Sequence, residues 1–399
     1  MTAALEDLRV IDLGHVLAGP FAGTLLADLG ADVIKVEPPE GDGLRLLGPR
    51  KDDRPLWWMV AARNKRCVTL DLRTPEGQDV LVRLAREADV LVENFRPGTM
   101  ERWNIGWDRL HAENPRLVML RISGYGQQSA GSNPKPMFGR PSEALSGALH
   151  LTGFPDGPPN HIGFSVGDTT TALMGAYGVM AALHDRERTG EGQVVDLALF
   201  ETLFRMIEWH IPTYDQLGIV TERAGNRFPL GLMVGNVYPS ADGKWLSMSA
   251  ASDSVIRRML TLVGGEELAD DPRFATHQAR GVRENLEALL DAVGTWIAQR
   301  PAQEVLDEFE RAGAVIAMVH DAADIVDSPA YKDREAIVTV HDEHLGPVKM
   351  PNAVPRLSAS PGSVRWTGPD IGQHNEDVYC GLLGMSAEEL AQLRAAGAI

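Results

Sequence analysis

Cysteine is nearly absent from this chain of 399 residues, which has only Cys67 and Cys380. Two cysteines cannot form a disulfide framework, and they supply too few thiolates for a cysteine-based metal site. Hydrophobic runs are short as well, and none approaches the roughly 20 residues that a membrane-spanning helix needs. The first residues lack the basic and apolar regions of a signal peptide. We therefore expect a cytoplasmic protein that does not enter a membrane.

Positive charge is also scarce. The chain has 38 Lys and Arg residues against 55 Asp and Glu residues, which gives a net charge of −17. This balance argues against general nucleic-acid binding, which depends on a basic face. It does not argue against an anionic small ligand, because a few local arginines and helix N-termini can bind phosphates.

Several common catalytic motifs are missing from the sequence. It contains no P-loop and no G-x-S-x-G nucleophile elbow. The turn at Gly14, Gly19 and Gly23 does not follow G-x-G-x-x-G, although Glu37 ends the second predicted strand where a ribose-binding acid would lie. A nicotinamide-dependent dehydrogenase is therefore only an alternative. The pair His341 and His344 has no third ligand nearby, so we expect no metal site.

Strand and helix patterns alternate through the first 200 residues, which predicts parallel βαβ units. The predicted strands are "LRVIDL", "DVIKVE", "RCVTLDL", "DVLVENF", "LVMLRISGYG" and "QVVDLAL". The expected helices include one after Pro20 and one that begins with Thr74 as N-cap and Pro75 in its first turn. Ligands of such sheets bind at the carboxyl ends of the strands. The segments "GHVLAGP", "ENFRPG" and "SGYGQQ" are therefore the first candidates for a site.

The sequence pattern changes after a long predicted helix over 200–217. A polar connector follows, then a predicted hairpin around Asp242 and Gly243 and helices near 254–263, 285–299 and 301–312. We interpret 1–225 as the N-terminal part of a large domain and 226–325 as a smaller α+β domain. Residues 326–399 are expected to return to the large domain and to end in a helix.

Asp168 presents a question that its local sequence leaves open. It precedes three threonines and apolar residues at helical spacing, so Asp168 is expected to be the N-cap of a helix. The alternative is that its carboxylate reacts.

Five ordered blocks of the sequence together resemble one superfamily. They are "VIDLGHVLAGPFAGTLLADLGADVIKVEPPEGD", "NKRCVTLDLRTPEG", "ADVLVENFRPGTMERWNIGWDRLHAENPRLVMLRISGYGQ", "EALSGALHLTG" and "GDTTTALMGAYGVMAALHDRERTGEGQVVDLALFETL". Over about 5–205 the chain is similar to the class III coenzyme A transferases, the superfamily that also includes the α-methylacyl-CoA racemases. The resemblance implies a Rossmann-like large domain built from both termini, a smaller α+β domain, and an interlocked homodimer.

The resemblance also implies a reaction. In these transferases the aspartate that matches Asp168 attacks an acyl-CoA thioester, and an aspartyl anhydride and an aspartyl-CoA thioester follow. CoA is a substrate of this reaction, with no tightly bound cofactor and no metal. The partners expected are acyl-CoA and carboxylic acids. The residues themselves indicate which acids: the site loops contain no long apolar run, and Arg45, Arg50 and His15 lie in or near the first strand–turn segments, where a cation could bind a second carboxylate. The acids exchanged are therefore expected to be short-chain or dicarboxylic, and the alternative is that these arginines serve CoA or the surface.

The family's CoA contacts match a set of positions in this sequence. They are Leu17, Ala18, Leu70, Arg73, Asn94, Phe95, Arg102 and Lys135. The sequence departs from the formyl-CoA branch at Leu17, where that branch has glutamine, and at Pro38, where it has a CoA-binding arginine whose role Arg45 or Arg50 could take. Gly139 occupies a position that is often acidic, and the glycine-run lid loop is missing.

The racemase branch is the main alternative within the superfamily. Its two-base mechanism uses a histidine just before the "ALSG" block as partner of the aspartate, and Phe138 stands at that position here. One base cannot exchange a proton on both faces of a carbon. The sequence therefore favours a transferase over a racemase.

Overall fold

The computed structural model describes residues 2–127, 136–231 and 233–399. The chain divides into two compact units. Unit 1 consists of Met1–Ser146, Gly163–Met206 and Pro329–Ile399, and unit 2 consists of Gly147–Ile162 and Ile207–Ser328. The domain limits expected from the sequence stay a prediction.

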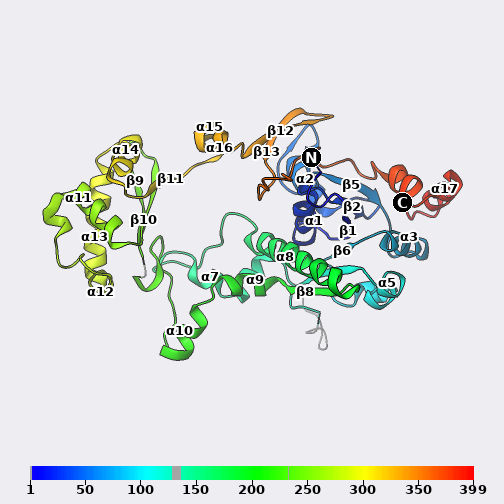
Figure 1. Cartoon of the computed structure of the whole chain (residues 1–399), viewed down its shortest axis with the longest axis horizontal. Helices are drawn as coiled ribbons and strands as arrows, with labels where there is room; N and C mark the ends of the chain where they lie inside the picture. The colour runs from blue at the N-terminus through cyan, green and yellow to red at the C-terminus, as the bar shows by residue number, and fades with distance from the viewer. Residues whose placement is uncertain (1, 128–135, 232) are drawn as a thin grey trace. The chain divides into compact units, whose positions relative to one another are not determined.

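Unit 1 contains a six-stranded parallel sheet among the described residues, with the order β5-β2-β1-β6-β7-β8 (Figure 1). Its strands are β1 (Arg9–Asp12), β2 (Asp32–Glu37), β5 (Lys65–Thr69), β6 (Val90–Glu93), β7 (Val118–Ser123) and β8 (Val194–Ala198). In chain order these strands read 3-2-1-4-5-6, the doubly wound arrangement, in which the winding reverses between the first and fourth strands. The predicted parallel α/β sheet is confirmed, and its reversal point lies between β1 and β6.

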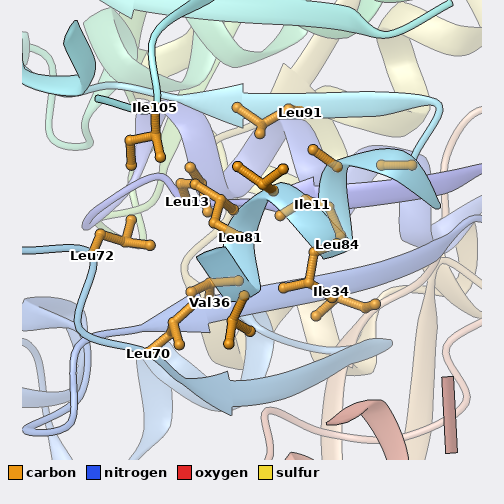
Figure 2. Packing of buried hydrophobic residues seen from close by; sticks show 14 of the residues in the cluster. Ile11, Leu13, Ile34, Val36, Leu70, Leu72, Leu81, Leu84, Leu91 and Ile105 are labelled. Atoms are coloured by element: carbon orange, nitrogen blue, oxygen red, sulfur yellow. The ribbon is translucent and has the colours of Figure 1, made fainter. Parts of the chain in front are cut away.

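Alternating side chains of the strands form two separate cores. On one face, Val10, Val33 and Val90 pack with α1 (Ala18–Asp28) and α8 (Val166–Thr189). On the other face, strand residues such as Ile11 and Ile34 pack with α3 (Pro75–Arg86) and α5 (Trp107–Glu113). Figure 2 shows this second core, where Leu81 and Leu84 meet the strand side chains. Both faces of the sheet are covered, and the strand residues that enter these two cores are apolar.

The C-terminal segment packs on the edge of this sheet. The Tyr379 hydroxyl donates to the Thr69 carbonyl at 2.8 Å, and the Cys67 N–H donates to Nδ1 of His374 at 3.1 Å. The segment contains the π-helical turn η4 (Asp377–Leu382) and α17 (Ala387–Ala395), which Ser386 caps. Residues from both ends of the chain therefore build unit 1.

The remaining elements of unit 1 are short helices and two antiparallel strand pairs, β3-β4 and β12-β13. They are η1 (Gly43–Leu46), β3 (Arg50–Lys51), β4 (Arg54–Pro55), α2 (Leu56–Ala61), α4 (Thr99–Arg102), α6 (Gly139–Leu145), α9 (Leu199–Met206), α16 (Pro329–Asp333), β12 (Ile337–Asp342) and β13 (Gly346–Pro351).

Unit 2 is an α+β structure with an antiparallel sheet in the order β11-β10-β9. Its elements are α7 (Ala148–Leu151), α10 (His210–Leu217), η3 (Pro229–Gly231), β9 (Val234–Pro239), β10 (Trp245–Ala250), α11 (Asp253–Ala269), α12 (His277–Arg280), α13 (Arg283–Ala298), α14 (Ala302–Ala312), β11 (Ile316–Met318) and α15 (Ala322–Asp327). The predicted hairpin is confirmed, because β9 and β10 pair on either side of the turn at Gly243. The three predicted helices of this region correspond to α11, α13 and α14.

One predicted helix is wrong. The sequence pattern gave a single helix over 200–217, whereas the structure has α9 and α10 with a break at 207–209. Pro212 lies in the first turn of α10 and has no N–H to continue an earlier helix, so the helix has to restart before it. Within the described part of the chain, every helix is too short or too polar to cross a bilayer.

Candidate active site

The candidate site is a cavity at the carboxyl ends of the parallel strands. Its wall is formed by residues that follow β1, β6 and β7, together with the start of α6, Asp168 of α8 and Leu199 after β8. The lining residues at the carboxyl ends of the strands and directly after them are His15, Val16, Leu17, Ala18, Asn94, Phe95, Arg96, Pro97, Ile122, Ser123 and Gly124. Because β1 and β6 flank the reversal of the winding, the cavity lies where doubly wound sheets bind their ligands.

Asn94 joins the loops that follow β1 and β6. Its side-chain oxygen accepts from the His15 N–H at 2.6 Å, and its amide nitrogen donates to the His15 carbonyl at 2.9 Å. The His15 ring also meets the Phe95 ring edge-on, with 5.3 Å between centroids. The two loops therefore form one surface, and Asn94 holds it together as well as lining the cavity.

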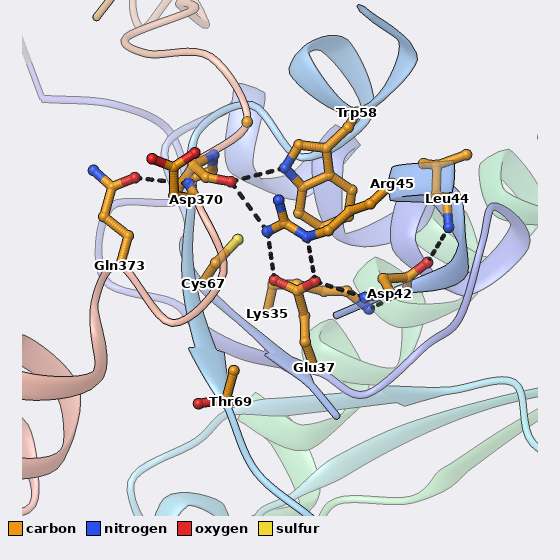
Figure 3. A network of polar contacts seen from close by, with 12 residues as sticks. Lys35, Glu37, Asp42, Leu44, Arg45, Trp58, Cys67, Thr69, Asp370 and Gln373 are labelled. Atoms are coloured by element: carbon orange, nitrogen blue, oxygen red, sulfur yellow. Dashed lines mark hydrogen bonds and ion pairs between the residues drawn. The ribbon is translucent and has the colours of Figure 1, made fainter. Parts of the chain in front are cut away.

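A buried cluster of charged side chains supports the loop that follows β1. The Asp42 carboxylate accepts from the Val16 N–H at 3.1 Å and from the Leu44 N–H at 2.8 Å, and it lies 3.1 Å from Nζ of Lys35. Figure 3 shows Asp42 and Lys35 beside the ion pair of Glu37 and Arg45. Burial alone would raise the pKa of Asp42, but the Lys35 charge and the donors around it hold that pKa below its ordinary value.

This support matters because the loop contains a strained residue. Val16 has φ = 63°, in the left-handed region that a β-branched residue rarely adopts. Such a conformation persists only where surrounding contacts enforce it, and the bond from the Val16 N–H to Asp42 is one of them. With Val16 in this conformation, His15, Leu17 and Ala18 all line the same cavity.

Asp168 is not the helix cap that the sequence predicted. The helix α8 starts at Val166 with Ser165 at the N-cap position, so Asp168 lies in the first turn. The hydroxyls of Thr169, Thr170 and Thr171 donate back to carbonyls of the preceding turn at 3.0, 2.6 and 2.7 Å. Among the described residues, no side chain donates a hydrogen bond to the Asp168 carboxylate, which lines the cavity.

The surroundings of Asp168 favour its protonated form. Burial raises the pKa of Asp168 from 3.8 to about 6, and the nearby Glu143 carboxylate adds to the shift. The carboxylate packs directly against the backbone of Gly139 at the start of α6, where an added Cβ would lie 2.3 Å from Oδ2 of Asp168. The carboxylate is therefore more basic than an ordinary aspartate, and its position depends on the missing side chain at residue 139.

A second cavity in unit 1 adjoins the same loops. Its lining includes Leu70, Arg73, Pro38 and Glu40, and it shares His15 and Phe95 with the Asp168 cavity. The Arg73 guanidinium is exposed and forms an ion pair with Asp71 at 2.8 Å. An apolar wall with a cation at its rim can accept a ligand that has both a flat apolar part and phosphates.

Comparison with known proteins decides the family. Residues 5–375 match CoA-transferase family III. The chain is 47% identical to a succinyl-CoA–D-citramalate CoA-transferase of Chloroflexus aurantiacus over 98% of this chain and 97% of that protein. It is 39% identical to the beta subunit of a succinyl-CoA–L-malate CoA-transferase of the same organism, over 98% and 97% of the two chains. A CaiB/BaiF family protein from Brucella suis has a similar structure, with a TM-score of 0.84 and 30% identity over 96% of this chain and all of that one.

The chain belongs to CoA-transferase family III.

Within this family III CoA-transferase, the residues expected from the sequence fall into three groups. The Asp168 cavity brings together Asp168, Leu17, Ala18, Asn94 and Phe95. The second cavity contains Leu70 and Arg73. Arg102 lies in neither lining and donates to the Thr99 hydroxyl at 2.8 Å, and Lys135 lies outside the described residues.

The expectation that Arg45 is available to a substrate is wrong. Two of its nitrogens donate to the Glu37 carboxylate at 2.7 Å, one of them also donates to the Pro369 carbonyl, and the guanidinium lies 3.8 Å above the Trp58 ring. Glu37 is fully buried in this pair, so it cannot bind a ribose as the dehydrogenase alternative requires. Arg50 donates to the carbonyls of Arg45 and Asp53 and lines neither cavity.

Two features of the site were not predicted from the sequence. One is that Arg96 lines the Asp168 cavity, and the other is that the Asp168 carboxylate packs against the backbone of Gly139. Arg96 lies at an exposed position directly after Phe95, and the same "ENFRPG" segment would have indicated it. The contact of Gly139 with Asp168 joins residues 29 positions apart in sequence. No local signal predicts it. Phe138, at the position of the racemase histidine, lines the cavity and carries no proton-transfer group.

Proposed function

We propose that Asp168 is the nucleophile that carries CoA from one carboxylic acid to another in this CoA-transferase. Its carboxylate oxygen attacks the thioester carbon of the donor, the C–S bond breaks, and a mixed anhydride and CoA thiolate form. The thiolate then attacks the aspartyl carbon and releases the donor acid, which leaves an aspartyl-CoA thioester. The acceptor carboxylate attacks this thioester to form a second anhydride, and the thiolate resolves it into product and free Asp168.

The observation that carries this proposal is the state of the Asp168 carboxylate. It faces a cavity at the reversal point of the sheet, receives no side-chain hydrogen bond from the described residues, and has a pKa raised to about 6 by burial. A more basic carboxylate is a better nucleophile, and at neutral pH it is still largely ionised. Because one thioester replaces another, the reaction is near thermoneutral and uses CoA as a substrate rather than a tightly bound cofactor.

We also propose a path for CoA along the two adjoining cavities. The nucleotide end would lie against Leu70 and Arg73, and the thioester would reach Asp168 past His15 and Phe95, which line both cavities. The backbone of Leu17 and Ala18 contributes the N-terminus of α1, where unpaired N–H groups can stabilise a developing negative charge. Arg102 and Lys135 remain candidates for phosphate contacts.

Arg73→Ala is expected to raise the KM for acyl-CoA about tenfold and to lower kcat less than threefold. A phosphate contact far from the reacting carbon stabilises ground state and transition state equally, so its loss changes binding more than chemistry. Steady-state kinetics with varied acyl-CoA measures both constants, and Arg102→Ala is the parallel variant for the other proposed phosphate contact. An unchanged KM in either variant would remove that residue from the CoA path.

For the substrates, we propose short dicarboxylic acids. Similar proteins carry names such as succinyl-CoA–D-citramalate CoA-transferase and succinyl-CoA–L-malate CoA-transferase, and a formyl-CoA:oxalate CoA-transferase of Streptomyces avermitilis is 34% identical. A screen of acids with succinyl-CoA as donor, read by mass spectrometry of new CoA esters, tests the proposal. Transfer to dicarboxylic acids supports it. Exchange of an α-proton without transfer would instead support the racemase alternative.

We further propose that the enzyme works as a homodimer. On α8, the apolar side chains Leu173, Tyr177 and Met180 are exposed at helical spacing, and Phe204 and Met206 of α9 are exposed as well. Exposed apolar stripes of this kind mark association surfaces. Light scattering is expected to give twice the mass of one chain at micromolar concentration. A monomer at that concentration would contradict the proposal.

A further inference from the structure

The cavity at Asp168 contains few groups that could bind a second carboxylate of a dicarboxylic acid. Among its described lining residues, only His15 and Arg96 have side chains that can carry positive charge. Arg45 pairs with Glu37 instead, and Arg50 lies outside the lining. The question is which of the two remaining side chains recognises the acid.

His15 is held in place at several points. Asn94 bonds both its backbone N–H and its carbonyl, and the ring packs edge-on against Phe95. Nδ1 of the ring lies 3.6 Å from Oδ2 of Asp42. The side chain is nevertheless 40% exposed, so one side of the ring is anchored while the other remains open to a ligand.

Asp42 is a fixed anchor for this ring. Its side chain is 1% exposed and is held by the Val16 and Leu44 N–H groups and by Lys35. Nδ1 of His15 faces this fixed carboxylate, which leaves Nε2 as the outward nitrogen. When a carboxylate binds on the outer side, the ring lies between two anions, and a hydrogen bond from Nε2–H to that carboxylate is charge-assisted.

Arg96 differs from His15 in this respect. It lies at an exposed position, and within the described part of the chain its guanidinium has no hydrogen bond or ion pair that would fix it. A mobile arginine would have to lose side-chain freedom on binding a small acid, whereas the His15 ring is already placed. The anchored residue is therefore the better recognition group.

We propose that His15, oriented by Asp42 and Asn94, binds the carboxylate of the acceptor acid that does not react with the Asp168 thioester. The outward Nε2–H donates to this distal carboxylate, while the reacting carboxylate faces Asp168. His15 thereby selects dicarboxylic over monocarboxylic acids. This inference rests on the proposed transfer to dicarboxylic acids.

The test compares two acceptors that differ by one group. L-malate and (R)-3-hydroxybutyrate match except that a methyl replaces the distal carboxylate, and succinyl-CoA serves as donor for both. The quantity measured is the ratio of kcat/KM for malate to kcat/KM for 3-hydroxybutyrate.

His15→Asn keeps an amide near the Nδ1 position for Asp42 and loses the outward nitrogen, whereas His15→Gln places a neutral donor near the Nε2 position. His341→Asn, at an exposed position of β12, is the matched control.

We expect His15→Asn to lower the malate to 3-hydroxybutyrate ratio about tenfold or more, because a charge-assisted hydrogen bond is lost for malate alone. His15→Gln should recover part of the ratio, and His341→Asn should leave it unchanged. If His15→Asn slows both acceptors equally, or if Arg96→Gln rather than His15→Asn abolishes the preference, the inference is overturned. A wild-type enzyme that transfers CoA but does not prefer malate would refute the proposed substrate class itself.

Discussion

Asp168→Asn is expected to abolish CoA transfer, with a loss of at least about a thousandfold in kcat, while acyl-CoA binding stays within about threefold of the wild type. Asparagine has nearly the same shape, but its amide oxygen cannot form the anhydride. The measurement is transfer of CoA from succinyl-CoA to an acceptor acid, followed by mass spectrometry, together with calorimetric binding of CoA. Asp168→Ala is the companion variant, because it cannot deamidate back to aspartate. Activity above a few per cent in both variants would contradict the nucleophile.

The same substitution is expected to stabilise the protein. Burial raises the pKa of Asp168 from 3.8 to about 6, so the folded state holds its proton more tightly than the unfolded chain does. The free energy of unfolding of the wild type therefore falls as pH rises from 3.8 to about 6. The fall is at most about 3 kcal/mol, and solvent screening reduces it. Asparagine has no such loss. The excess stability of Asp168→Asn should be absent below pH 3.8 and complete above pH about 6. A stability difference between Asp168→Asn and the wild type that does not change with pH would contradict burial as the cause of the raised pKa.

Gly139→Ala is expected to lower kcat about tenfold to a hundredfold and to leave the KM for acyl-CoA within about threefold. The new Cβ would lie 2.3 Å from Oδ2 and 2.9 Å from Cγ of Asp168, so the carboxylate has to turn away. Misplacement of a reacting group by about 1 Å can cost a hundredfold in rate. The backbone at Gly139 does not need a positive φ, and alanine is the better helix former, so the variant should fold.

Gly381→Ala is the matched control for this variant. An added Cβ at residue 381 meets nothing within 4 Å, and the backbone there is not in the positive-φ region. Thermal unfolding shows whether each protein is folded, and steady-state kinetics separates kcat from KM. A Gly139→Ala enzyme with more than half of the wild-type kcat would show that the position of Asp168 does not depend on residue 139.

The layout of the sheet could be predicted from the sequence because its signals are local. Apolar runs such as "LRVIDL" and "DVLVENF" gave the strands, and Thr74 with Pro75 gave the start of α3. The start of α8 was misplaced because tertiary packing decides it. Gly167 of α8 lies against α6, where an added Cβ would meet the Gly139 carbonyl at 2.7 Å. This contact favours a helix α8 that begins before Asp168, the N-cap that the sequence alone suggests.

The candidate site was predicted less completely than the fold. The resemblance supplied Asp168 and four other lining residues of its cavity (Leu17, Ala18, Asn94 and Phe95), but it could not tell which cation is available. Arg45 and His15 look equally suitable in sequence, and only the folded chain pairs Arg45 with Glu37 and leaves His15 in the cavity. The partners that anchor His15 are Asp42 and Asn94, which are 27 and 79 positions away and come together through the order of β1, β2 and β6.

Asp168 is expected to become covalently bound to CoA during turnover, and mass spectrometry of the protein can detect this intermediate. The enzyme is mixed with succinyl-CoA in the absence of an acceptor, quenched in acid and digested, and the peptide that contains Asp168 is examined. We expect a CoA thioester on Asp168 that disappears on addition of an acceptor acid and never forms in Asp168→Ala. A CoA adduct on another residue, or transfer at the wild-type rate with no adduct at Asp168, would contradict it.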